Sequence, residues 1–200
     1  MNLVWLVGRL LGAARAALLH GGARLAFLIA FALAVPAANA EGITLKSARV
    51  EPVEEGWQID AEFDIQFSPR LEESVNRGVP LYFVLEFEMS RPRWYWFDEK
   101  PVRFSQTYKI SYTPLLRQYR LSVGNVYQNF SSFEEVTHVL SKLRGVAIAD
   151  HNAIKKDSAY QARVRLRLDT AQLPKPFQLN AIASRDWSLS SDWQSWSLAP

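Results

Sequence analysis

The sequence predicts an all-β protein, folded as an antiparallel two-layer sandwich with one short and one longer inserted helix. Segments in which apolar and polar residues alternate with period two recur along most of the chain. The stretches between them are short and rich in turn residues, and strand patterns do not alternate with helix patterns as in βαβ units. An immunoglobulin-like arrangement is one form of such a sandwich. A closed barrel around a ligand cavity is the alternative.

Residues 1–40 form a leader that contains three arginines and no acidic residue. Its apolar run, residues 25–35, is followed by small residues at Ala38 and Ala40. These features are typical of a secretory signal peptide, in which Ala38 and Ala40 are recognised by the signal peptidase and the cut falls before Glu41. We therefore expect export by the general secretory route and a periplasmic location.

An uncleaved anchor in the inner membrane is the competing interpretation of this leader. A membrane-spanning helix needs about 20 apolar residues. The run here ends at Pro36, which favours cleavage.

Charge and cysteine content exclude several function classes. The 200-residue chain has 23 basic and 20 acidic residues, but three of the basic residues lie in the leader, so the remaining chain is expected to carry no net charge. This balance argues against nucleic-acid binding. The absence of cysteine excludes thiolate nucleophiles and thiolate metal sites.

The strands follow in order after the leader. The first is expected over residues 43–50, and residues 57–67 show the clearest alternation of apolar and acidic or amide side chains. Further alternating runs are residues 81–89, 102–112, 119–123 and 160–168, with one or two late strands within 177–183 and 187–198.

The two helices have recognisable ends. Residues 69–77 are bounded by Ser68-Pro69 and Gly78, which is the usual placement of proline and glycine around a short helix. In the longer helix, residues 132–143, Ser132 and Glu135 have the spacing of a capping box. Gly145 is expected to end this helix.

No composition shift, repeat or linker divides residues 41–200, so they are predicted to form a single domain.

The sequence contains no motif for catalysis, nucleotide binding or metal binding, so we expect neither an enzyme nor a cofactor. Outside the leader the histidines are His138 and His151. His138 lies off the apolar face of its helix, and Asp150-His151-Asn152 is typical of a turn, although such a group could hold a metal weakly. A hydrolase that uses surface carboxylates is a minor alternative.

Charged side chains form rows on several predicted strands. Asp60, Glu62 and Asp64 alternate on one strand, Glu86 and Glu88 on another, and Arg163, Arg165 and Arg167 on a third. If the Asp60 strand neighbours the Arg163 strand, the rows form cross-strand ion pairs. The other possibility is that the arginine row binds an anion or a partner.

Aromatic residues supply the candidate contact surface. They are Trp94, Tyr95, Trp96 and Phe97, which are consecutive, and Trp187, Trp193 and Trp196 near the C-terminus. Because alternation cannot bury four consecutive rings, part of this group is expected to be exposed to a glycan, a protein partner or a membrane interface. Packing between the hairpin and the C-terminal tryptophans is the alternative.

Four segments resemble an uncharacterised family of exported proteins from Proteobacteria, classed as a domain of unknown function. The segments are residues 78–87, 91–96, 173–181 and 187–191. The resemblance covers essentially the whole chain after the leader and supplies no catalytic residues. It implies an envelope accessory that works beside a membrane-bound sensor kinase of the nitrogen-regulation type.

Together these observations predict a non-catalytic binding or accessory module of the cell envelope, monomeric or weakly oligomeric. Its partner is expected to be an envelope protein, such as that sensor kinase, and its membrane contact is limited to the leader during export. A carrier with an apolar pocket for a lipid or small ligand is the alternative.

Overall fold

The computed structural model describes residues 42–91, 99–154 and 158–198. The described residues all belong to one compact unit, Ala40–Pro200. Within the described ranges, no helix is both long and apolar enough to cross a membrane.

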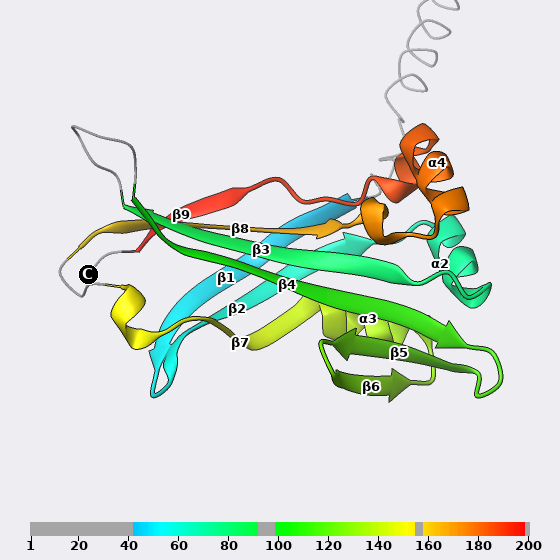
Figure 1. The fold of residues 1–200 in the computed structure, drawn as a ribbon, viewed down its shortest axis with the longest axis horizontal. Coiled ribbons are helices and arrows are strands. Elements are labelled where there is room, and N and C mark those ends of the chain that lie inside the picture. The colour runs from blue at the N-terminus through cyan, green and yellow to red at the C-terminus, as the bar shows by residue number, and fades with distance from the viewer. Residues whose placement is uncertain (1–41, 92–98, 155–157, 199–200) are drawn as a thin grey trace, which may run out of the picture. The chain divides into compact units, whose positions relative to one another are not determined.

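The described residues form two open antiparallel sheets (Figure 1). The smaller sheet has the order β1-β2-β7, with β1 at Gly42–Val53, β2 at Gly56–Gln66 and β7 at Lys142–Ala149. The larger has the order β6-β5-β4-β3-β8-β9. Its strands are β3 (Leu81–Arg91), β4 (Glu99–Thr113), β5 (Gln118–Val123), β6 (Val126–Phe130), β8 (Tyr160–Leu168) and β9 (Gln194–Leu198). The prediction of a mainly β, two-sheet fold is confirmed, and neither described sheet closes into the alternative barrel.

The apolar residues of the alternating strands form one core that both sheets share. Ile59 and Phe63 of β2 and Phe83 and Phe87 of β3 are all at most 2% exposed and belong to a single hydrophobic cluster that draws on both sheets. The intervening side chains, such as Glu86, point away from this core. The result is sandwich-like, with one buried and one solvated face on each sheet.

The short helix α2 (Pro69–Asn76) forms as predicted. Ser68 Oγ accepts a hydrogen bond from the Leu71 amide at 3.3 Å, and Pro69 occupies the first turn, where its missing N–H costs nothing. Gly78 has a φ of 90°, which suits glycine just beyond a helix end.

The longer helix is shorter than predicted. Helix α3 covers Phe133–Ser141, and its N-terminal cap is confirmed because Ser132 Oγ accepts from the Glu135 amide at 3.1 Å. The helix does not continue to residue 143, because Leu143 pairs with Ala61 of β2 and is therefore part of β7. Gly145 lies inside that strand instead of ending the helix.

The segment expected to hold a late strand at residues 177–183 is instead helix α4, Lys175–Ala183. Pro174 is its N-cap residue and Pro176 lies in its first turn, where proline is tolerated. Of the other predicted late segment, only β9 is a regular strand; short 3₁₀ turns cover His151–Ala153, Thr170–Gln172 and Arg185–Trp187.

Candidate binding face

The acidic and basic rows do pair, but with different partners from those expected. The Asp60 strand is β2, whose neighbours are β1 and β7, so it does not lie beside the Arg163 strand. Asp60 and Glu62 face Arg144 of β7, at 3.4 and 3.6 Å. The prediction that joined the Asp60 and Arg163 strands is therefore wrong, because pairing with β7 occupies that edge of β2.

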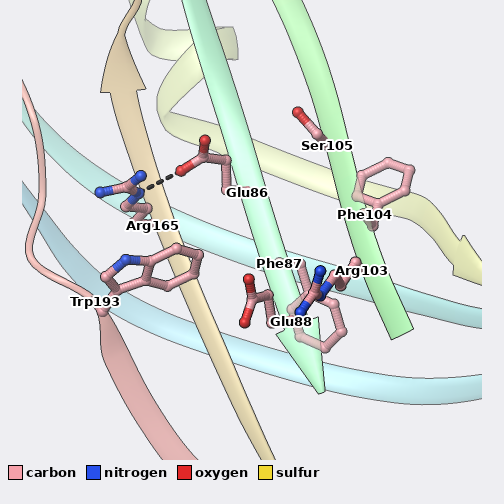
Figure 2. Close-up of a pocket in the computed structure, with 8 residues that line it drawn as sticks. All are labelled: Glu86, Phe87, Glu88, Arg103, Phe104, Ser105, Arg165 and Trp193. Carbon is pink, nitrogen blue, oxygen red and sulfur yellow. Dashed lines mark hydrogen bonds and ion pairs between the residues drawn. The ribbon is translucent and has the colours of Figure 1, made fainter. Parts of the chain in front are cut away.

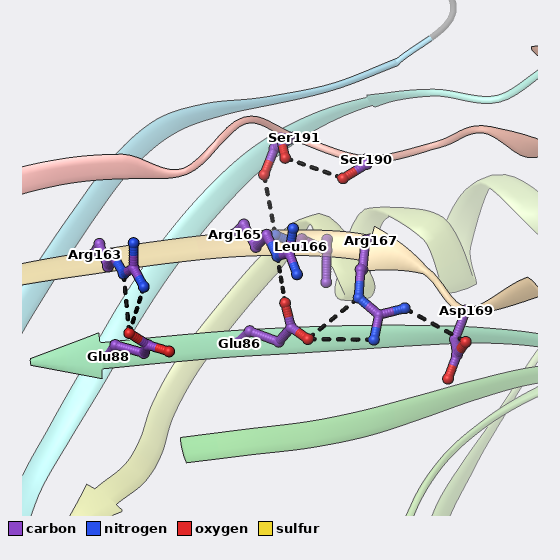
Figure 3. A network of polar contacts seen from close by, with 9 residues as sticks. All are labelled: Glu86, Glu88, Arg163, Arg165, Leu166, Arg167, Asp169, Ser190 and Ser191. Carbon is purple, nitrogen blue, oxygen red and sulfur yellow. Dashed lines mark hydrogen bonds and ion pairs between the residues drawn. The ribbon is translucent and has the colours of Figure 1, made fainter. Parts of the chain in front are cut away.

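The arginine row of β8 pairs with β3 (Figure 3). The register places Glu88 opposite Arg163 and Glu86 opposite Arg165. Arg163 Nε and Nη2 both donate to Glu88 Oε2, at 3.1 and 2.5 Å, and Arg165 donates to Glu86. Arg167 donates to Glu86 Oε1 at 3.2 Å. We call these five side chains the arginine ladder.

Each glutamate of the ladder is held by two cations. Besides Arg163, Glu88 accepts from Lys100 Nζ at 3.1 Å. Partial burial would raise the pKa of Glu88, but the hydrogen bonds and charges of Arg163 and Lys100 outweigh it, so the pKa of Glu88 lies below its ordinary value. The Glu88 carboxylate is thus ionised, and both glutamates are paired with cations within the sheet.

Trp193 covers the ladder from the side of β9. Its ring lies 4.5 Å from the Arg163 guanidinium carbon and 4.7 Å from that of Arg165. Such contacts hold both guanidinium groups over the aromatic face. The ladder is therefore a fixed array, ordered by ion pairs on one side and by an indole on the other.

Three further cations on the same outer face make no ion pair with any residue of the described ranges. Arg103 is exposed opposite Glu88, whose carboxylate is taken by Arg163 and Lys100. Lys109 lies 5.7 Å from the centre of the Tyr82 ring. Arg120 Nε donates to Asn129 Oδ1 at 3.0 Å, which leaves its charge uncompensated.

The two outer faces consequently differ in charge. We define the charged face as the outer side of the larger sheet, where strand parity and the contacts above place seven basic and three acidic side chains: Lys100, Arg103, Lys109, Arg120, Arg163, Arg165 and Arg167 against Glu86, Glu88 and Asp169. On the smaller sheet the basic residues Lys46, Arg49, Lys142 and Arg144 balance Glu51, Asp60, Glu62 and Asp64. Among the described strands, positive charge thus accumulates on one side.

A depression of about 270 Å³ lies on the charged face (Figure 2). Arg165 and Trp193 stand on one side of it and Arg103 on the other, with Glu86 and Glu88 between them. The remaining lining residues are Phe87, Phe104 and Ser105. The depression lies between Arg165 of the ladder and the uncompensated Arg103, so an anionic group bound there would be flanked by both.

The three C-terminal tryptophans of the predicted contact surface, which the structure describes, do not lie on one face. Trp187 is 5% exposed and packs against Phe177 with ring centres 6.3 Å apart, so it is a core residue and not a contact residue. Trp196 is half-buried 6.4 Å from the Phe87 ring, on the inner side of β9. Of the C-terminal tryptophans, Trp193 alone lies on the charged face.

Several predicted sites fall outside the described residues. They are the signal-peptidase residues Ala38 and Ala40 and the aromatic run Trp94, Tyr95, Trp96 and Phe97. These predictions stay predictions. The run connects Arg91 at the end of β3 to Glu99 at the start of β4, two residues that form an ion pair.

The histidines have ordinary surroundings. His138 is exposed on α3, and His151 Nε2 contacts the carbonyl oxygen of Glu54. No group of three or more His, Asp or Glu side chains that could hold a metal ion occurs in residues 42–91, 99–154 and 158–198.

Sequence reasoning missed Lys100, Arg103, Lys109 and Arg120 as members of the face. A signal was available, since Arg103 and Lys109 have the same strand parity and could have been placed together on one side of β4. Parity does not show which strands lie beside β3, so the extent of the charged face could be seen only in the structure.

A family of known proteins matches most of the chain. Residues 40–197 match the family described as a domain of unknown function (DUF4390). No curated protein matches the chain, and no solved structure matches it.

Proposed function

We propose, on the premise that this chain belongs to the DUF4390 family, that it is an exported, non-catalytic binding module of the cell envelope whose charged face holds an acidic segment of a partner protein. The observation that carries the proposal is the set of uncompensated cations, Arg103, Lys109 and Arg120, beside a ladder whose own carboxylates are already neutralised.

The spacing of these cations favours an extended partner over a small anion. Arg103 and Lys109 are six positions apart on β4, which corresponds to about 20 Å along a strand. A single phosphate or carboxylate cannot contact both. A peptide segment with several Asp or Glu residues can, and the charge asymmetry would also accelerate its encounter with the face.

The order within the ladder supports a binding role. Arg163 and Arg165 are fixed by Trp193 and by Glu86 and Glu88. When a partner carboxylate binds these arginines, their side chains lose little conformational entropy, because they are already ordered. The depression beside Arg165 offers a place for one such carboxylate.

The leader and the family resemblance supply the rest of the proposal. We expect the partner to be an envelope protein, and a membrane-bound sensor kinase is the first candidate to examine.

The immunoglobulin-like comparison is limited to the presence of two facing sheets. Strands β3 to β6 form a sequential meander, whereas immunoglobulin domains use Greek-key connections.

The alternative of a lipid or small-ligand carrier is less well supported. The depressions described on β2 and β7, on α3 and on the charged face are open and include charged side chains, whereas a lipid pocket is enclosed and mainly apolar.

The test is a pair of matched double variants expressed as the full chain. Arg103→Gln with Lys109→Gln removes two charges from the charged face, and Arg49→Gln with Lys142→Gln removes two from the smaller sheet. Proteins crosslinked to each in intact cells are identified. Purified protein is also titrated with a labelled ten-residue oligoglutamate by fluorescence anisotropy.

The first double variant should lose its crosslinked envelope protein and bind oligoglutamate about fivefold or more weakly, or about 1 kcal/mol. The second should behave as the wild type, and added salt should weaken the wild-type complex. Equal behaviour of the two double variants would refute the proposal.

A further inference from the structure

Strand β6 is an edge strand without the usual protection. Within the described ranges it pairs only with β5, and Figure 1 shows it at the margin of the larger sheet. Its residues Val126–Phe130 include no charge and no proline, and its register with β5 is unbroken. Val126 is 75% and Tyr127 59% exposed.

In contrast, both edge strands of the smaller sheet carry features that prevent pairing with another strand. Strand β1 carries Lys46 and Arg49 and has a bulge between Leu45 and Ser47. Strand β7 carries Arg144 and a left-handed Gly145, with φ of 60°. Charges and bulges of this kind prevent pairing with another chain. Their absence from β6 marks that edge as able to accept a strand.

The turn before β6 determines which of its main-chain groups are free. Val123 and Val126 close a two-residue turn, so they form a hydrogen-bonded pair. By alternation, Gln128 and Phe130 also direct their main-chain groups to β5. The N–H and C=O groups of Tyr127 and Asn129 therefore point outward.

We propose that β6 pairs antiparallel with β6 of a second copy of this chain, about a two-fold axis at Gln128. In this register Tyr127 faces the second copy's Asn129, and each of the two equivalent pairs exchanges both of its outward hydrogen bonds. Gln128 faces its own counterpart. The register uses every outward group of the strand, which a shift by two residues in either direction would not.

The side chains are complementary in the same register. Val126 and Phe130 point to the inner side of the sheet, and the second copy's Phe130 lies directly opposite Val126. Phe130 borders an open depression of about 510 Å³ on α3, together with the half-exposed Val139. The exposed valine of each copy thus meets the apolar part of a depression on the other, and symmetry repeats the contact.

Strand β6 brings no charged residue of its own to this pairing. The cation nearest to the strand in the register is Arg120, which is stacked 4.3 Å from the Tyr127 ring on the outer side. Its Cα atom is three strand spacings, or about 14 Å, from that of its symmetry mate, and its guanidinium group reaches over β6 toward the second copy. A five-residue strand buries less than a standard interface, so the dimer is expected to be weak.

The chain contains no cysteine, which permits a direct test of the register. Gln128→Cys places two thiols opposite each other at a non-hydrogen-bonded pair, about 4.5 Å between Cα atoms, within the range of a disulfide. Val126→Cys, on the same strand, lies four positions from its counterpart, about 13 Å. Under mild oxidation of the purified full chain, Gln128→Cys should form a covalent dimer at least tenfold faster than Val126→Cys. Equal rates would overturn the register.

Sedimentation equilibrium tests the dimer itself. Val126→Lys introduces the missing edge charge and should weaken self-association at least tenfold without lowering the melting temperature, because Val126 is largely exposed. Leu115→Lys is the matched control, since Leu115 is 92% exposed on the β4–β5 turn and should have no effect. A wild-type monomer at the highest concentration, or a dimer that persists in Val126→Lys, would overturn the proposal.

Discussion

Replacing Phe133 tests whether contacts of α3 with both sheets stabilise the fold. Phe133 is 7% exposed, and its ring lies 5.1 Å from Phe67, which follows β2, and 5.7 Å from Tyr119 of β5. One side chain therefore contacts both sheets. Each ring pair contributes about 0.5–1.5 kcal/mol beyond the burial of its area.

Two substitutions separate the ring contacts from burial. Phe133→Leu keeps most of the apolar volume and loses both ring pairs, so the free energy of unfolding should fall by about 1–3 kcal/mol. Phe133→Ala also leaves a cavity and should cost about 3–5 kcal/mol. Urea unfolding followed by tryptophan fluorescence measures both. Leu115→Ala, at an exposed site, should change stability by less than about 0.5 kcal/mol.

A double-mutant cycle gives the refuting result. Phe67→Leu and Phe133→Leu are measured alone and together, and a coupling of about 0.5–1.5 kcal/mol is expected for rings in contact. If the two losses add without coupling, or if Phe133→Leu costs no more than Leu115→Ala, α3 does not link the sheets through this ring.

The remaining predictions concern an ion pair and two glycines. Because the pKa of Glu88 is lowered from its ordinary 4.5, the carboxylate stabilises the fold above that pH, and this contribution is lost as pH falls through the folded pKa. The difference in unfolding free energy between wild type and Glu88→Gln should therefore shrink between pH 7 and pH values below 4.5 in a urea series; a difference independent of pH would contradict this. Gly56→Ala should destabilise by about 3 kcal/mol in thermal unfolding, because φ is 147° and a Cβ would lie 2.2 Å from the Ala149 carbonyl oxygen. Gly124→Ala, with φ of 55° and no atom within 4 Å of the added Cβ, should cost only about 1 kcal/mol, and equal losses would refute the role of the clash.

Strands with strong alternation were predictable from sequence, and less regular elements were not. The run through Ile59 and Phe63 reads as a strand because one face is buried and the other solvated. Strand β6 escaped prediction because all of its side chains except Phe130 are exposed, so burial leaves no alternation. At residues 177–183 a short apolar run fits either a strand or a helix, and Pro176 was the overlooked sign of a helix start.

The candidate site was predictable in its components but not in its assembly. The row of Arg163, Arg165 and Arg167 is visible as alternation, but its partner depends on which strand lies beside β8. The sequence suggested that the Asp60 strand lies beside β8, but in the structure β3 pairs with β8. Trp193 was singled out as an aromatic residue, yet its contact with two guanidinium groups depends on how the chain enters β9.

The chain order of the two sheets has a consequence for biosynthesis. Strand β2 is made early, but its outer neighbour β7 is not complete until Ala149, after the whole meander from β3 to β6 has been synthesised. Until then Ile59 and Ala61 lack the strand that pairs with them through Val146 and Leu143. A nascent chain that stalls before residue 142 therefore presents an open, partly apolar strand edge, which is prone to aggregate. A chain that emerges from its N-terminus, whether from the ribosome or across a membrane, cannot complete the smaller sheet in order, so the edge of β2 stays unpaired until β7 has followed.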